Sequence, residues 1–124
     1  MPSKNRSLLI LRYLWDHTDE FHPATITEIL AYLETQGVRA NRKTVAADTQ
    51  DFQECGRDIV CNRRRQNQYF IGDRGLELPE LKLIIDAVQA ARFISSRRTE
   101  AILEKLTQMA SPSDQEELRR RLFV

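Results

Sequence analysis

The chain has 124 residues, of which 41% are hydrophobic and 30% are charged, and its formal net charge is +1. This length allows one domain or two small ones, and the composition is that of a folded, soluble protein and not of a disordered one. No apolar run approaches the roughly 20 residues that cross a bilayer, and the N-terminus lacks a signal-peptide pattern, so we expect a cytoplasmic protein without membrane contact.

The first helix is predicted from Lys4 to His17, where apolar residues recur at helical spacing. The stripe consists of Leu8, Leu11, Leu14 and Trp15, and Ile10 widens it. A polar connector follows over residues 18–24, in which Pro23 keeps the helix from continuing. We expect Phe21 to fold back from this connector onto the core.

A second helix is predicted to begin at Thr25, because Thr25-Ile26-Thr27-Glu28 matches a capping box. Its buried side consists of Ile26, Ile29, Leu30 and Leu33. Gly37 follows its end, and Val38 is expected to pack into the core. After this short turn Asn41 caps a third helix. Two helices joined by a tight turn that contains glycine form a helix-turn-helix.

The third helix is predicted over residues 41–55, and its two faces differ. One face carries Val45, Thr49 and Phe52 and is expected to pack on the other helices. The opposite face carries Arg42, Lys43, Ala46, Ala47 and Gln50. Small residues let a helix lie close in a groove of DNA, while basic side chains can meet phosphates or guanine and glutamine can pair with adenine. An ordinary amphipathic helix with a solvated polar face is the alternative.

A β-hairpin is predicted over residues 58–72, because the helical period gives way to alternation around Ile59 and to a β-rich run at residues 68–71. The segment Arg64-Arg65-Gln66-Asn67 serves as its tip. A hairpin directly after such a helix is a wing, and its arginines can reach the phosphate backbone or the minor groove. A solvated hairpin end is the alternative. Residues 39–47 and 59–72 contain no acid, which favours a local basic surface on a nearly neutral chain.

Three further helices are predicted after the turn at residues 72–75. Pro79 is suited to be the first residue of the fourth helix, the Ser95-Ser96 pair recaps the chain for the fifth, and Ser113-Asp114-Gln115-Glu116 is a capping box for the sixth. Their apolar stripes are Leu81, Ile84, Ile85, Val88 and Ala91, then Ile102, Leu103, Leu106 and Met109, then Leu118 and Leu122. These stripes must pack on each other or on a second copy. The expected fold is mainly α with a small β-hairpin, a winged helix-turn-helix over residues 1–73 and a helical module over residues 74–124.

The ordered combination of these segments resembles the N-terminal part of the WYL-domain transcriptional regulators of bacteria and phages. The likeness rests on Arg12 in the first helix, on Thr27-Glu28-Ile29 and on Asn41-Arg42-Lys43-Thr44-Val45-Ala46-Ala47-Asp48. It continues through Gly56 and Ile59, Tyr69-Phe70-Ile71, the run from Leu78 to Val88, and Glu104-Lys105-Leu106. The resemblance implies a winged helix-turn-helix with a helical linker.

Two features depart from the family pattern. Thr49 stands where an aliphatic residue is usual, which loosens the packing of the third helix slightly. The sensing WYL domain and C-terminal extension of the family do not follow, because the chain ends at Leu122-Phe123-Val124. This fits a natural short form or a truncated one, and it leaves an effector unidentified.

The leading interpretation is a repressor-like regulator that binds double-stranded DNA with the third helix in the major groove and acts as a homodimer on an inverted repeat. The expected DNA contacts are Thr25, Arg39, Asn41, Arg42, Lys43, Thr44, Ala46, Ala47, Gln50, Arg63, Arg64, Arg65 and Asn67. The expected dimer contacts are Leu81, Ile84, Ile85, Val88, Ile102, Leu106, Met109, Leu118 and Leu122. A winged helix that binds another protein is the alternative, since fold does not fix function.

An enzyme is disfavoured, because the chain has no phosphate-binding loop and no nucleophile beside a histidine in a known motif. Cys55 and Cys61 have no zinc spacing and no secretory context, so reduced thiols are expected. His17 and His22 lie near no ligand pattern either. We therefore expect no metal, no cofactor and no small-molecule ligand.

Overall fold

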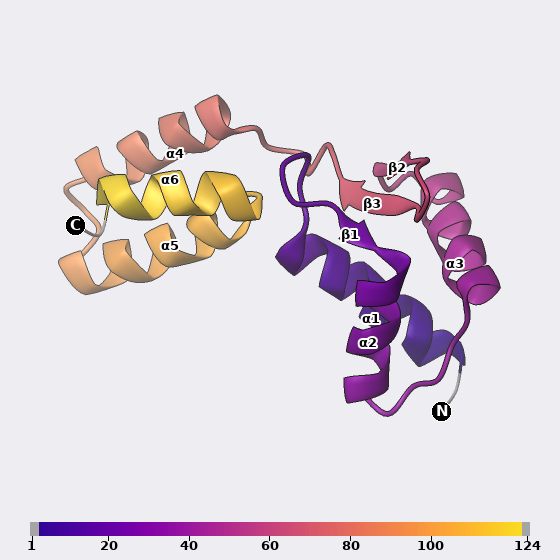
Figure 1. Cartoon of the computed structure of the whole chain (residues 1–124). Coiled ribbons are helices and arrows are strands. Elements are labelled where there is room, and N and C mark those ends of the chain that lie inside the picture. Colours follow the sequence, from indigo (N-terminus) through magenta and orange to yellow (C-terminus); the bar gives the residue numbers. More distant parts are fainter. Residues whose placement is uncertain (1–2, 123–124) are drawn as a thin grey trace. The chain divides into compact units, whose positions relative to one another are not determined.

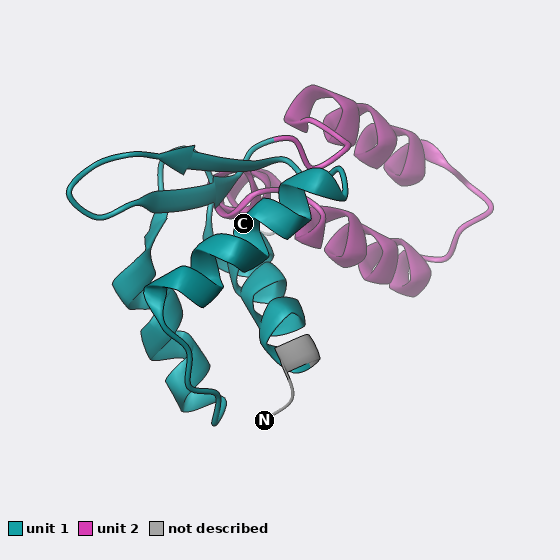
Figure 2. Cartoon of the chain, turned by 90° about the vertical axis from the view of Figure 1, so that its right-hand side faces the viewer, with its two compact units in different colours: residues 1–72 teal, residues 73–124 magenta. Residues whose placement is uncertain are grey.

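The computed structural model describes residues 3–122, and the side chains from Asn5 onward, so Phe123 and Val124 lie outside it. Within that range the chain forms six helices and three strands (Figure 1). It divides into two compact units, unit 1 over Met1–Gly72 and unit 2 over Asp73–Val124 (Figure 2). The mainly helical fold with a small β-hairpin is confirmed. Among the described residues, no helix combines the length and the hydropathy needed to cross a membrane.

Unit 1 has the element order of a winged helix-turn-helix. The elements are α1 (Ser3–His17), β1 (Ala24–Thr25), α2 (Ile26–Thr35), α3 (Arg42–Glu54), β2 (Ile59–Asn62) and β3 (Gln68–Ile71). The strands form an antiparallel sheet in the order β1-β3-β2. The short strand β1 was not predicted: it pairs Ala24 with Tyr69, so the start of α2 is attached to the hairpin.

The core of unit 1 draws on every helix and strand of the unit. Its buried residues are Ile10, Leu14, Ala24, Ile26, Ile29, Leu33, Val38, Val45, Ile59, Tyr69 and Ile71. The predicted burial of Val38 is confirmed, and it holds the turn between α2 and α3 against the core. Alternation in the hairpin turns Tyr69 and Ile71 inward and Gln68 and Phe70 partly outward.

Two expectations for α1 and its connector are wrong. Leu8 is 67% exposed, because Ile10 and Leu14 occupy the centre of the buried face and Leu8 lies on the opposite side of the helix. Phe21 is also exposed. The turn that carries Phe21 closes on itself, since Asp19 and His22 exchange backbone hydrogen bonds and the Asp19 carboxylate accepts from the Phe21 N–H. This tight turn ends before Phe21 can reach the core.

The predicted starts of α2 and α3 are confirmed. Thr25 caps α2 in a reciprocal arrangement with Glu28, and Asn41 caps α3 in the same way with Thr44. Gly37 follows α2 with a positive φ of 77°, a conformation that is strained for residues with a Cβ. The turn between the two helices is therefore determined at both of its ends.

Unit 2 consists of α4 (Leu78–Ala90), α5 (Ser96–Gln108) and α6 (Pro112–Leu122). Its buried core is Leu81, Ile85, Leu103, Ala110 and Leu118. The predicted start of α6 is wrong: the helix begins at Pro112, and the Ser111 hydroxyl accepts the Asp114 N–H at 3.2 Å. Proline is favoured in the first turn of a helix, so the cap falls on the residue before it, and Ser113 lies inside the helix.

An ion pair joins α5 to α6. The Arg119 guanidinium donates to both oxygens of Glu104, at 2.9 and 3.0 Å. These hydrogen bonds lower the pKa of Glu104 below its usual value. A carboxylate with a depressed pKa stabilises the folded state above its unfolded pKa, and this contribution is lost as the pH falls through the lowered folded pKa.

We therefore expect Glu104→Gln to lower the unfolding temperature at pH 7 and to lower it less at pH 3. Thermal melts of both proteins followed by circular dichroism between these pH values measure the difference. Glu100→Gln is the matched control, because Glu100 is exposed on the same helix and makes no ion pair with a described residue. A Glu104→Gln deficit that persists undiminished at pH 3 would contradict the role of this carboxylate.

Candidate nucleic-acid interface

One face of α3 is open to solvent and the other is buried. Val45, Asp48 and Thr49 are buried against the rest of unit 1. The exposed residues of the open face are Arg42, Lys43, Ala46, Ala47 and Gln50, the same five that the sequence assigned to it. The open face is thus basic at its N-terminal end, small in the middle and polar beyond.

Asp48 was not predicted to be buried, and an ion pair with α1 explains its position. The Arg6 guanidinium donates from Nε and Nη2 to the two oxygens of Asp48, at 2.7 and 3.1 Å. The Asp48 side chain is only 5% exposed and that of Arg6 20%. The hydrogen bonds to Asp48 raise the pKa of Arg6 above its usual value. A bidentate ion pair of this kind fixes the orientation of the two side chains as well as their distance, so it sets the rotation of α3 about its own axis.

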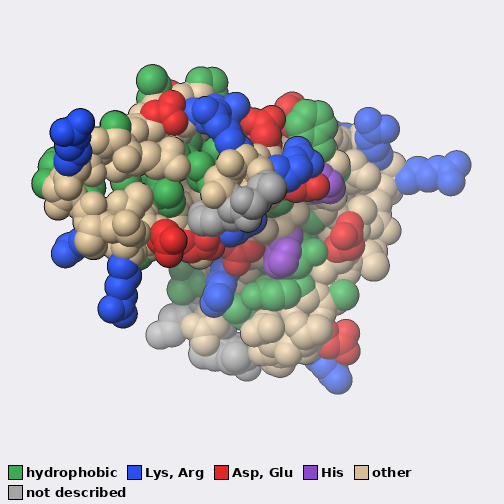
Figure 3. Space-filling model, turned by 90° about the vertical axis from the view of Figure 1, so that its left-hand side faces the viewer, with side chains coloured by type: hydrophobic (Ala, Val, Ile, Leu, Met, Phe, Trp, Pro, Cys, Tyr) green, Lys and Arg blue, Asp and Glu red, His purple; other side chains and the backbone are tan. Residues whose placement is uncertain are grey.

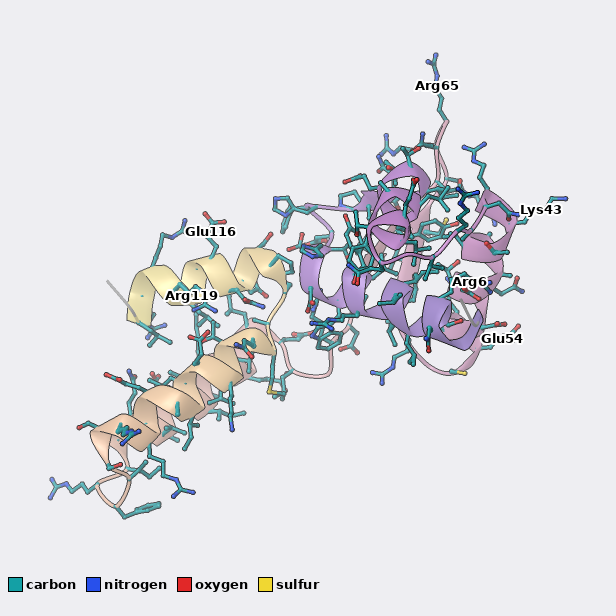
Figure 4. The ribbon with its side chains drawn as sticks, turned by 90° about the horizontal axis from the view of Figure 1, so that it is seen from below. Arg6, Lys43, Glu54, Arg65, Glu116 and Arg119 are labelled. Carbon is teal, nitrogen blue, oxygen red and sulfur yellow. The ribbon has the colours of Figure 1, made fainter. Side chains whose placement is uncertain are left out.

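The basic end of α3 and the tip of the hairpin border one groove. This groove has a free volume of about 330 Å³. Its lining residues are Ile26, Arg42, Lys43, Ala46, Arg65 and Asn67. Lys43 extends from the start of α3 and Arg65 from the hairpin tip, both away from the body of the unit (Figure 4). Three cations and no acid line the groove, and this arrangement suits a phosphate of a nucleic-acid backbone.

A second groove, of about 390 Å³, runs between α3 and the hairpin. It is lined by Ala46, Thr49, Gln50, Gln53, Cys61, Arg63, Asn67 and Tyr69. Ala46 and Asn67 border both grooves, so the two form a continuous concave surface, which we call the α3–hairpin surface. Gln53 was not predicted as part of it. Its side-chain amide donates to the Ile59 carbonyl at 2.7 Å and ties the end of α3 to β2.

The remaining expected DNA contacts divide into capping residues and exposed ones. Thr25, Asn41 and Thr44 have their side-chain oxygens engaged in the caps of α2 and α3. Arg39, Ala47 and Arg64 are exposed but line neither groove. The capping residues therefore position the starts of α2 and α3.

Most of the expected dimer contacts form the core of a single copy. Leu81, Ile85 and Leu118 are fully buried within unit 2. Val88, Leu106 and Leu122 pack on that core, and Ile102 is half-buried. Only Ile84 and Met109 are exposed. The apolar stripes of the three helices thus pack mainly on one another within a single copy.

Among residues 3–122, no cluster of three or more histidine, cysteine, aspartate or glutamate side chains could hold a metal ion. The chain matches no protein-family model, no curated protein and no solved structure.

Proposed function

We propose that the protein is a sequence-specific, repressor-like transcriptional regulator of the cytoplasm that binds double-stranded DNA as a homodimer. The observation that carries this proposal is the acid-free groove in which Arg42 and Lys43 of α3 meet Arg65 of the hairpin. Three cations from two separate elements border a concave surface whose other lining residues, Ile26, Ala46 and Asn67, are uncharged. A duplex presents a phosphate ridge of complementary charge and curvature to such a surface.

In the proposed complex α3 lies in the major groove. The exposed Ala46 and Ala47 let the helix backbone approach the base edges closely. Gln50 lies where it can pair with adenine, and Arg42 where it can bind guanine or a phosphate. The hairpin acts as a wing on the adjacent backbone or minor groove. Because a single α3 covers few base pairs, two copies on an inverted repeat, with half-sites one or two helical turns apart, provide the required specificity.

A protein-binding winged helix is the alternative, and one observation favours it. An apolar groove of about 360 Å³ on unit 1 is lined by Leu8, Leu11, Arg12, Trp15, Asp16 and Arg57. It shares no residue with the α3–hairpin surface. A protein partner would prefer this groove, since interface anchors are usually apolar or aromatic.

Selection of bound sequences from random duplex DNA tests the proposal directly. We expect an enriched motif with two-fold symmetry and a retarded complex at low salt. Failure to enrich any motif, together with no retarded complex at low salt, would contradict DNA binding and favour the protein-binding alternative.

Substitutions in α3 and at the hairpin tip are expected to change DNA binding in different ways. Gln50→Ala should relax base preference and cost about 1–3 kcal/mol on the selected site only. A combined Arg64→Ala and Arg65→Ala change should weaken every duplex similarly and reduce the salt slope, because a wing tip mainly contacts backbone. Paired titrations on the selected and a scrambled duplex separate the two. If the wing variant alone lost discrimination, the wing would be the part that reads bases.

A further inference from the structure

Unit 2 leaves one face of α4 uncovered. Leu83 is 71% exposed, and Ala87 and Ala90 follow it on the same side of the helix, opposite the buried Leu81 and Ile85. Ile84 is also exposed on its flank. The core of unit 2 is complete without these side chains, so its packing does not explain their hydrophobic character. Exposed apolar stripes of this kind commonly mark interaction sites.

An exposed aromatic side chain and three exposed cations lie in the turn after α4 and at the start of α5. Phe93 is 91% exposed, the largest exposure among the large hydrophobic residues of the described chain. Arg92, Arg97 and Arg98 are exposed around it and form no ion pair with a described residue. Two of these arginines lie in the first turn of α5, where the helix dipole disfavours cations. Their presence therefore does not serve the stability of α5.

The two ends of this surface carry opposite charge. The start of α4 is acidic, with Glu77 at the cap and Glu80 in the first turn. The far end is the arginine cluster around Phe93. Figure 3 shows hydrophobic side chains interspersed with acidic and basic ones on one face of the molecule. Exposed Asp86 adds a carboxylate beside the middle of this face. A surface with acids at one end, mainly apolar side chains in the middle and arginines at the other end is complementary to a second copy of itself in the reversed orientation.

We infer that this surface, which we call the α4 face, binds a second copy of the chain with the two α4 helices antiparallel across a two-fold axis. In that arrangement the acidic end of each helix meets the basic turn of the other, and Leu83 packs on the small Ala87 of its partner. A two-fold dimer requires such a self-complementary patch. Phe93, a large aromatic side chain at the end of the stripe, is suited to anchor the contact.

A stable dimer buries about 800 Å² on each partner around an apolar centre and a polar rim. The α4 face provides both parts, with aliphatic and aromatic side chains in the centre and charges at the ends. The inference rests on the proposed function in one respect only, since it specifies how the two DNA-binding copies are held together.

Sedimentation equilibrium without DNA at micromolar concentration tests the dimer itself. We expect the wild-type protein to have about twice the chain mass of 14.5 kDa. Leu83→Glu should raise the dimer dissociation constant roughly thirtyfold or more, as the loss of an interface anchor does. Phe21→Glu is the matched control, because Phe21 is an apolar residue of unit 1 with nearly the same exposure, 72%, and it should leave the dimer intact.

A charge exchange tests the antiparallel arrangement. Glu77→Arg or Arg92→Glu alone should weaken the dimer, while the two together should restore it, and circular dichroism confirms folding in each case. A monomeric wild type, a Leu83→Glu dimer of unchanged affinity, or a double variant without rescue would each overturn the inference. A short duplex with one half-site separates the test of the dimer from the test of DNA binding. The Leu83→Glu variant should still bind this duplex. A protein that remains dimeric but does not bind DNA contradicts only the proposed function.

Discussion

Affinity for the selected duplex is expected to fall by about a thousandfold between 50 and 200 mM salt, if about six phosphates are contacted. The cations available for these contacts at and around the α3–hairpin surface are Arg39, Arg42, Lys43, Arg63, Arg64 and Arg65. Each neutralised phosphate releases condensed counterions, so the logarithm of the affinity falls linearly with the logarithm of the salt concentration. Fluorescence anisotropy on a labelled duplex across this range measures the slope.

Single variants assign the slope to particular side chains. Lys43→Ala should reduce its magnitude by about one, because one phosphate contact is lost. Arg121→Ala is the matched control, since Arg121 is an exposed cation of unit 2 outside the proposed interface, and it should leave the slope unchanged. An affinity that stays flat across the range, or a slope that Arg121→Ala lowers as much as Lys43→Ala does, contradicts the assignment.

Loss of the Asp48 carboxylate is expected to lower the free energy of unfolding of unit 1 by about 3 kcal/mol, near the low end for a broken buried ion pair. The reason is that Asp48→Ala leaves the largely covered Arg6 guanidinium without the two hydrogen bonds it now donates. The low end applies because the Arg6 side chain is 20% exposed and water can reach it. Urea denaturation followed by circular dichroism measures the loss.

Asp51→Ala is the matched control for this experiment. Asp51 is exposed on the same helix and makes no ion pair with a described residue, so its removal should change the stability little. A double variant with Arg6→Leu and Asp48→Leu should be more stable than Asp48→Ala, because no uncompensated charge remains covered. If Asp48→Ala and Asp51→Ala were equally stable, the pair would not hold α3 in place.

The effect of Asp48→Ala on DNA binding shows whether Asp48 acts through its negative charge or through the orientation of α3. Asp48 is buried and cannot meet a phosphate, so simple removal of an acid would at most strengthen binding. We expect the opposite, a weaker and less selective complex, since α3 loses the contact that sets its rotation. Titrations on selected and scrambled duplexes below the unfolding transition provide the measurement.

Several features of this protein follow from the sequence alone because the interactions behind them are local. The caps at Thr25 and Asn41 span only four residues each, and the periodicity of α3 separates its open face from its buried one. The arginine-rich hairpin tip follows from alternation on both sides of a polar segment. The interactions behind these features join residues close together in the sequence, so the residue types indicate them before the fold is known.

The tertiary structure alone decided which of several possible faces became the core. Leu8 and Ile10 belong to the same apolar helix, and only packing against α2 and β3 selected Ile10. The Arg6–Asp48 pair joins residues 42 positions apart, and the groove between Arg42 and Arg65 depends on how the hairpin lies beside α3. In unit 2 the predicted stripe of α4 contained both Ile84 and Ile85, and packing buried Ile85 and left Ile84 exposed. Long-range contacts of this kind depend on how helices and strands pack against one another, and the local periodicity of the sequence does not specify that packing.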